Sequence, residues 1–220
     1  MRKFAAAAAL FAVALGGYPP PVASASSNAA QPRPPVRRPP ARAVALARES
    51  LAAVHAAGSG RATVTETGPG ERATATSWFR LAGGPAGIVV RPQAEPADIA
   101  EDPDGYARLR RCLDPRGAAA LFTVASAVRR MGPARVGGQV TVRYRLSVDL
   151  DVLPRTSPET VDDIAALRRA GLTHITVDVW LDQAKRPARV SLSAVAGGEP
   201  VETVDCRYYD WGSPPAEPPR

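Results

Sequence analysis

Apolar and polar residues alternate through residues 173–195 in two runs joined by a short turn. The apolar positions are Ile175, Val177, Val179 and Leu181 in the first run and Val190, Leu192 and Ala194 in the second. Alternation with period two is typical of a strand that buries one face. Because the residues between the runs, Gln183 to Pro187, are typical of a turn, we expect a β-hairpin whose apolar faces lie on the same side.

The same alternation predicts further strands. The longest run extends from Val140 to Val152, and a strand of that length has to twist and curl around other elements. Shorter strands are expected at residues 61–66, 72–81, 86–91 and 201–209, with Pro69-Gly70 as the turn between the first two.

Three segments have helical periodicity instead, at residues 43–57, 117–131 and 157–170. The first carries Val44, Ala47, Leu51 and Val54 at spacings of three and four. The expected stop signals are Gly58, Gly132-Pro133 and Gly171, and Ser157 is the expected N-cap of the third helix.

About seven antiparallel strands would each present one apolar face, whereas only three helices are available to cover them. We therefore expect an α+β fold, an open, strongly curved antiparallel β-sheet or half-barrel with about three helices in its concavity. Most inward helix positions are Ala and Val rather than Phe or Trp, so the helices would fill the concavity incompletely. An incompletely filled apolar concavity is a candidate binding site for an apolar ligand.

The chain is basic, with 28 Lys and Arg against 21 Asp and Glu and a net charge of +7. Almost all of the positive charge is arginine, and acidic residues are interspersed with it. Because no stripe of alternating aromatic and basic residues is present, the composition argues against nucleic-acid binding.

The first residues have the pattern of an export signal. Arg2 and Lys3 precede an apolar run from Phe4 to Leu15, which is too short to span a bilayer, and Ala23-Ser24-Ala25 is a cleavage site. We expect a signal peptide at 1–25, a Pro/Arg-rich linker at 26–41, one domain at 42–212 and a Pro-rich tail at 213–220. No cysteine near the end of the signal could carry a lipid anchor, so the expected location is secreted or in the cell envelope, outside the cytoplasmic membrane.

Two cysteines, Cys112 and Cys206, remain in a chain that is expected to be exported. Export permits oxidation, and a disulfide between them is the favoured interpretation. Two buried, unpaired thiols are the alternative. A zinc site is not supported, because only His55 and His174 could complete it.

The order of several short motifs resembles the actinobacterial LppX/LprAFG-like envelope lipoproteins, which belong to the LolA-like superfamily. The motifs are Val136-Gly137-Gly138, Val148-Asp149-Leu150, Val179-Trp180-Leu181-Asp182 and Asp210-Trp211-Gly212. The resemblance implies a curved open sheet with helices in its mouth and an apolar cavity that holds acyl chains. Carried over to this sequence, the cavity lining would be Val142, Leu146, Val148, Ile175, Val177, Val179, Val190 and Leu192. The chain departs from the family in lacking the lipobox cysteine.

Catalytic motifs are not found. Asp149 and Asp151 have the spacing of a D-x-D metal motif, but alternation places both on the polar face of a strand. The sequence contains no G-x-S-x-G elbow, phosphate loop or dinucleotide fingerprint. We expect no enzyme activity, no catalytic or metal-binding residues and no cofactor.

Two functions remain for a domain of this kind. The first is an exported, monomeric carrier that binds a lipid or lipoglycan and shields its acyl chains in the apolar cavity. The second is an envelope interaction or sensory domain on the same scaffold with a filled cavity; either allows peripheral contact with the membrane or envelope. Trp180 interrupts the polar face of its strand, and it lies either at a cavity rim or partner surface, or packed on the aliphatic stems of a neighbouring strand.

Overall fold

The computed structural model describes residues 39–68, 71–81, 88–92, 113–152, 164–165, 167–169, 171–196 and 199–213. These residues contain two helices with defined bounds, α2 (Ala41–Ala57) and α5 (Pro115–Val124). The strands are β1 (Ser59–Gly68), β2 (Glu71–Leu81), β3 (Ile88–Pro92), β4 (Ala125–Val136), β5 (Gln139–Asp149), β6 (His174–Asp182), β7 (Pro187–Ala196) and β8 (Glu199–Tyr209). Among these residues no helix is both long and apolar enough to cross a membrane.

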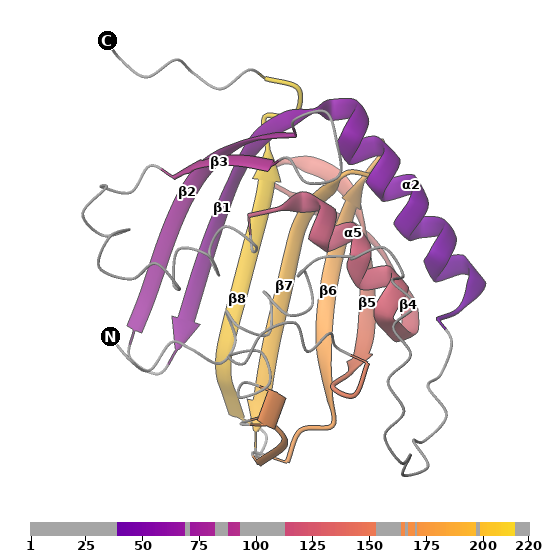
Figure 1. Cartoon of the computed structure of the whole chain (residues 1–220), viewed down its shortest axis with the longest axis vertical. Helices are drawn as coiled ribbons and strands as arrows, with labels where there is room; N and C mark the ends of the chain where they lie inside the picture. The colour runs from indigo at the N-terminus through magenta and orange to yellow at the C-terminus, as the bar shows by residue number, and fades with distance from the viewer. Residues whose placement is uncertain are drawn as a thin grey trace, which may run out of the picture.

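The strands form one open antiparallel sheet in the order β3-β2-β1-β8-β7-β6-β5-β4. Strands β3 and β4 lie at its two edges and do not pair with each other, so the sheet is not closed into a barrel. Both helices lie over one face of the sheet (Figure 1). This arrangement confirms the predicted α+β fold with an open, curved antiparallel sheet.

The hairpin expected at residues 173–195 is confirmed as β6 and β7. In-register pairing aligns apolar side chains across neighbouring strands, as in the row Leu146, Val177, Leu192 and Val204. Residues that face one another in such a row point to the same side of the sheet. The inner face, defined as the face under the helices, is therefore apolar from β5 to β8 and continues through Val64 on β1.

The second predicted helix is wrong beyond Val124. Helix α5 ends there, and residues 125–136 form the edge strand β4. The Gly132-Pro133 pair, expected to stop the helix, lies inside this strand just after a register irregularity at Arg130. A β-hairpin explains the difference, because Gly137 and Gly138 adopt positive φ values of 55° and 83° and fold β4 back onto the long strand β5. Proline is tolerated at an edge because its missing N–H is not needed by a second neighbour.

Two smaller predictions also change. The buried stripe of α2 is displaced from the predicted one, since Val44 and Leu51 are 37% and 39% exposed. The buried positions of α2 are Ala43, Leu46, Ala47, Ser50 and Val54. The long strand ends at Asp149 rather than Val152, because Val152 donates a backbone hydrogen bond to the Asp149 carbonyl in a turn.

Two predicted helix stops are confirmed. Gly58 caps α2 with a φ of 71°, and Gly171, with a φ of 83°, follows helical residues at 167–169 and donates to the Arg168 carbonyl. The Pro69-Gly70 turn, the Ser157 cap, the signal peptide, most of the linker and most of the tail lie outside the described residues.

The Asp210-Trp211-Gly212 motif fastens the end of β8 to the start of β1. Gly212 donates its N–H to the Ser59 carbonyl at 2.9 Å, and the Trp211 ring packs edge-on against Phe79 at 5.3 Å. Gly60 lies against the same ring of Phe79, because a Cβ there would be 2.7 Å from its Cζ. The motif is therefore structural in this chain.

This packing predicts the effect of Gly60→Ala. The new methyl would also lie 3.1 Å from the Tyr209 carbonyl, so we expect the free energy of unfolding to fall by about 1–3 kcal/mol in urea denaturation. In a Phe79→Leu background, which lacks the Cζ atom, the same substitution should cost less. An equal cost in both backgrounds would contradict this account.

Candidate functional site

The eight residues predicted to line a cavity all lie on the inner face. Seven of them are at most 1% exposed, and Val142 is partly buried against the same hydrophobic cluster. The pairs Val148 with Ile175, Leu146 with Val177, and Val179 with Val190 are direct cross-strand neighbours. The structure thus brings the predicted set together on β5, β6 and β7.

Other residues of this cluster come from the helices that cover the sheet. The Phe122 ring of α5 meets the Tyr144 ring of β5 edge-on at 5.8 Å. Ile164 and Leu167, in the region of the third predicted helix, are also buried in the cluster. The sequence analysis missed Phe122 as a cluster member, because Phe122 directly follows Leu121 and consecutive residues of a helix lie about 100° apart around its axis.

Small residues make up much of the buried surface of the two helices. They are Ala43, Ala47 and Ser50 on α2 and Gly117, Ala118 and Ala119 on α5. The helices pack against each other, and α5 also contacts β4, β5 and β7. The Ser50 hydroxyl is fully buried and has no hydrogen-bond partner within the described part of the chain.

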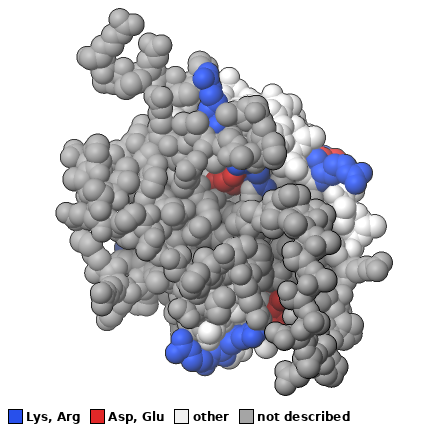
Figure 2. All heavy atoms as spheres, in the orientation of Figure 1, with Lys and Arg blue, Asp and Glu red and all other residues white. Residues whose placement is uncertain are grey.

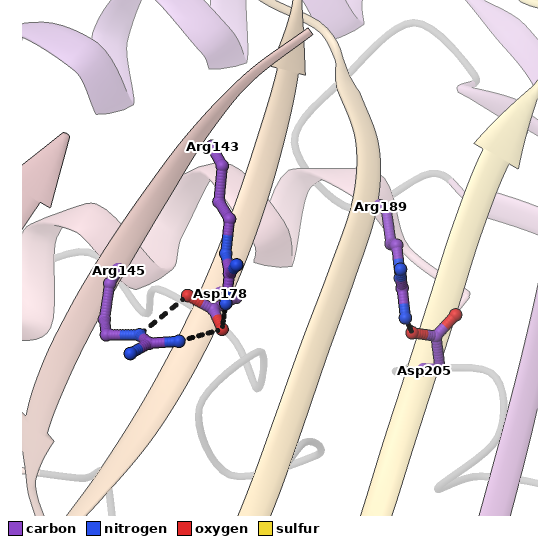
Figure 3. Close-up of polar contacts among 5 residues, drawn as sticks. All are labelled: Arg143, Arg145, Asp178, Arg189 and Asp205. Carbon is purple, nitrogen blue, oxygen red and sulfur yellow. Dashed lines mark hydrogen bonds and ion pairs between the residues drawn. The ribbon is translucent and has the colours of Figure 1, made fainter. Parts of the chain in front are cut away.

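The opposite, outer face carries arginine and aspartate side chains (Figure 3). Asp178 on β6 accepts hydrogen bonds from Arg143 at 2.5 Å and from Arg145 at 3.0 Å, both on β5. Asp205 on β8 accepts from Arg189 on β7 at 2.6 Å and from Arg207 at 3.2 Å. Each carboxylate therefore joins two guanidinium groups.

Trp180 lies between two of these arginines. The guanidinium carbons of Arg143 and Arg189 lie 5.1 Å and 4.7 Å from the centre of its ring, and the residue is only 7% exposed. A register irregularity between β6 and β7 occurs at the same position. The ring is thus covered by side chains of the neighbouring strands, which favours the packing interpretation of Trp180.

The two arginines change the acidity of Asp178. Partial burial opposes ionisation and by itself would raise the pKa, but the hydrogen bonds and charges of Arg145 and Arg143 outweigh it. The pKa of Asp178 is therefore lower than its ordinary value, and the hydrogen bond to Asp178 raises the pKa of Arg145. The ion pair is accordingly stable well into the acidic range.

The remaining acidic candidates have structural roles. The buried Asp182 accepts the Arg186 backbone N–H at 2.8 Å and the Arg186 Nε at 2.8 Å, which closes the β6–β7 turn. Asp149 accepts from the Ser126 hydroxyl, and Asp151 forms an ion pair with Arg168. In the described ranges no three His, Cys, Asp or Glu side chains converge as metal ligands.

Cys206 is fully buried on β8, on the inner face beside Val64 and Val190. Its predicted partner, Cys112, lies outside the described residues. The disulfide therefore stays a prediction.

The ion pairs predict the behaviour of Asp178→Asn. Because the pKa of Asp178 in the folded protein is below its ordinary value near 3.8, its contribution to stability is full above that pH and is lost as the pH falls through the folded-state pKa. At pH 7 we expect the variant to lose about 1–3 kcal/mol of unfolding free energy in urea titrations.

At acidic pH the difference between wild type and Asp178→Asn should shrink. Asp210→Asn is the matched control, because Asp210 is 48% exposed and its nearest contact to Arg61 is 3.6 Å. The control should change stability little at either pH. A difference between wild type and Asp178→Asn that does not depend on pH would contradict the role of the carboxylate charge.

Known proteins resemble this chain in structure but not detectably in sequence. No protein-family model matches the sequence, and no curated protein matches it. Lipoprotein LppX of Mycobacterium tuberculosis is 14% identical, with a TM-score of 0.43 over 79% of this chain and 96% of that protein. LprF of Mycobacterium bovis is 14% identical, with a TM-score of 0.47 over 83% and 98%. A putative outer membrane lipoprotein-sorting domain of Vibrio parahaemolyticus is 10% identical, with a TM-score of 0.34 over 76% and 90%. The solved structures that match thus include LppX-like and LolA-like proteins, the group whose motifs this sequence resembles.

Proposed function

We propose that this protein is a non-enzymatic carrier that shields the acyl chains of a lipid or lipoglycan between its helices and the inner face of its sheet. The observation that carries the proposal is the contrast between the two sides of this interface. A continuous apolar sheet face is covered by helix surfaces in which alanine and glycine are frequent. Alanine and glycine on the helices cover little of the apolar sheet face. An acyl chain inserted beside them would bury more of its apolar area.

Burial of apolar area would supply the binding energy. Each methylene of an acyl chain removed from water contributes about 0.8 kcal/mol before ordering costs. This contribution has no preferred direction, so the face needs shape and apolarity rather than specific polar groups. The aliphatic side chains of Leu146, Val177 and Leu192 are apolar and lie in register. Because they are fully buried under the helices, an acyl chain would have to displace covering side chains to reach them.

One polar group would suit the ester or hydroxyl end of such a ligand. The Ser50 hydroxyl shares the buried side of α2 with Ala47 and has no partner in the described part of the chain. A buried hydroxyl without a partner costs folding energy, and a ligand carbonyl that accepts its hydrogen bond would remove that cost.

The proposed carrier is exported and catalyses no reaction. The signal-like segment at 1–25 would export the chain, and the proposed carrier would work outside the cytoplasmic membrane as a monomer. Transport of a lipid needs no catalytic group, so the proposed carrier is not an enzyme and uses no cofactor.

The direct test is native mass spectrometry of the full protein from a host that makes its own envelope lipids, with the denatured extract analysed in parallel. We expect a bound species that releases an acyl lipid on denaturation. Bare protein that also fails to take up added fatty-acyl lipid would contradict the proposal and favour the interaction domain with a filled cavity.

Ala47→Phe distinguishes a fillable interior from a filled one. If acyl chains occupy space beside α2, the new ring should occupy that space, leave the thermal midpoint of the lipid-free protein within a few degrees and reduce lipid uptake severalfold. In a filled core the same ring would overpack and cost about 1–3 kcal/mol.

The matched control is Val44→Phe, which adds an aromatic ring to the exposed side of the same helix. It should change neither lipid uptake nor the thermal midpoint. Strong destabilisation by Ala47→Phe, with lipid uptake of the remaining folded protein unchanged, would argue against acyl chains lying beside α2.

A further inference from the structure

We propose that the outer face of the sheet is a docking surface for an acidic, extended segment of a partner protein, recognised by an arginine stripe. The stripe is defined as Arg129, Arg143, Arg145, Arg189 and Arg207. It lies on the face opposite the helices, so it is a different site from the proposed lipid-binding interior.

Strand register assembles the stripe. Arg129 on β4 faces Arg145 on β5, and a neighbouring row runs from Arg143 through Trp180 and Arg189 to Arg207. Adjacent strands lie about 4.8 Å apart, so the stripe spans about 19 Å from β4 to β8, across the strand direction.

The stripe has excess positive charge. Its five arginines are accompanied in the same rows by two aspartates, Asp178 and Asp205, so among the described residues of these rows the positive charges exceed the negative ones by three. The charges differ in accessibility as well, because the arginine side chains are 33% to 59% exposed where ion pairs form, whereas the aspartates are only 14% and 15% exposed. A partner that approaches this face therefore meets guanidinium groups first.

The aspartates position the guanidinium groups without exhausting them. A guanidinium has five N–H donors, and Arg145 gives two of them to Asp178 while Arg207 gives one to Asp205. The unused donors can bind carboxylates in the paired geometry that arginine favours. Because ion pairs already hold four of the five side chains, those of Arg143, Arg145, Arg189 and Arg207, binding would cost less side-chain entropy.

The helix side lacks such an array in the part of the chain that the structure describes. The described Lys and Arg residues that are visible on that side form separate groups (Figure 2). Arg42 and Arg48 on α2 are exposed, but no comparable in-register row of arginines surrounds them.

A polypeptide fits the stripe better than a lipid surface or a uniform polyanion. Trp180 is enclosed by arginines. The exposed large apolar residues of the described chain lie outside the two rows, and they are Val44, Leu51, Met131 and Val140. The rows therefore offer no apolar side chain for insertion into a bilayer. A uniform polyanion would meet Asp178 and Asp205 within the stripe, whereas an extended peptide can place neutral residues over the aspartates and flexible acidic side chains over the arginines.

The test uses the full protein and a synthetic peptide of alternating Glu and Ser, with a Gln and Ser peptide as the uncharged comparison. We expect only the Glu peptide to bind in fluorescence anisotropy. Its affinity should fall as the salt concentration is raised from about 50 to about 300 mM, because salt screens the attraction between exposed charges. The triple variant Arg129→Gln, Arg145→Gln and Arg207→Gln should weaken binding at least about tenfold.

A second triple variant, Arg42→Gln, Arg48→Gln and Arg169→Gln, is the matched control because it removes the same net charge from exposed positions outside the stripe. It should keep most of the affinity. Circular dichroism and lipid content, which should be unchanged in both variants, separate loss of docking from loss of fold or of the proposed carrier function.

Three results would overturn the proposal. They are equal weakening by both triple variants, absence of salt-sensitive binding of the Glu peptide, and binding to vesicles of phosphatidylglycerol and phosphatidylcholine that exceeds peptide binding and depends on the same arginines. The last result would identify an anionic lipid surface as the occupant instead.

Discussion

The register between β5, β6 and β7 is the constraint on which the rest of the structure depends. Because side chains alternate along a strand, a slip of one residue would move Leu146, Val177 and Leu192 from the helix side to the outer side. The same slip would bury the arginines and aspartates that now lie outside. One register therefore determines both the apolar interior and the charged exterior.

Turn chemistry and end packing hold that register. The Asp182 carboxylate closes the β6–β7 turn by binding the backbone and side chain of Arg186, and Lys185 takes a positive φ of 69° within it. At the same end of the sheet, Trp211 and Gly212 connect the end of β8 to β1 and β2. Residues that looked like family motifs in the sequence thus keep the strands aligned.

The two faces suit different kinds of binding. The inner face offers apolar area under helices with small side chains, which suits a flexible apolar ligand held without directional bonds. The outer face offers ordered guanidinium groups at strand spacing, which suits directional recognition of carboxylates. Because the sheet separates the two faces, a ligand on one leaves the other accessible, and one molecule could hold a lipid while docked to a partner.

The sequence by itself determined the elements whose side chains repeat with a single clear period. Alternation located β5, the β6–β7 hairpin and β8, and it placed the eight predicted lining residues together on one face, because burial of one sheet face requires period two. It failed at residues 125–131, where the apolar spacing is also compatible with a helix, and only pairing with β5 decided for a strand. The buried side of α2 was likewise decided by its packing against α5, since an alanine-rich helix has no dominant apolar stripe. The arginine stripe depended on tertiary structure as well, because Arg143 and Asp178 are 35 residues apart and meet only through the register of paired strands.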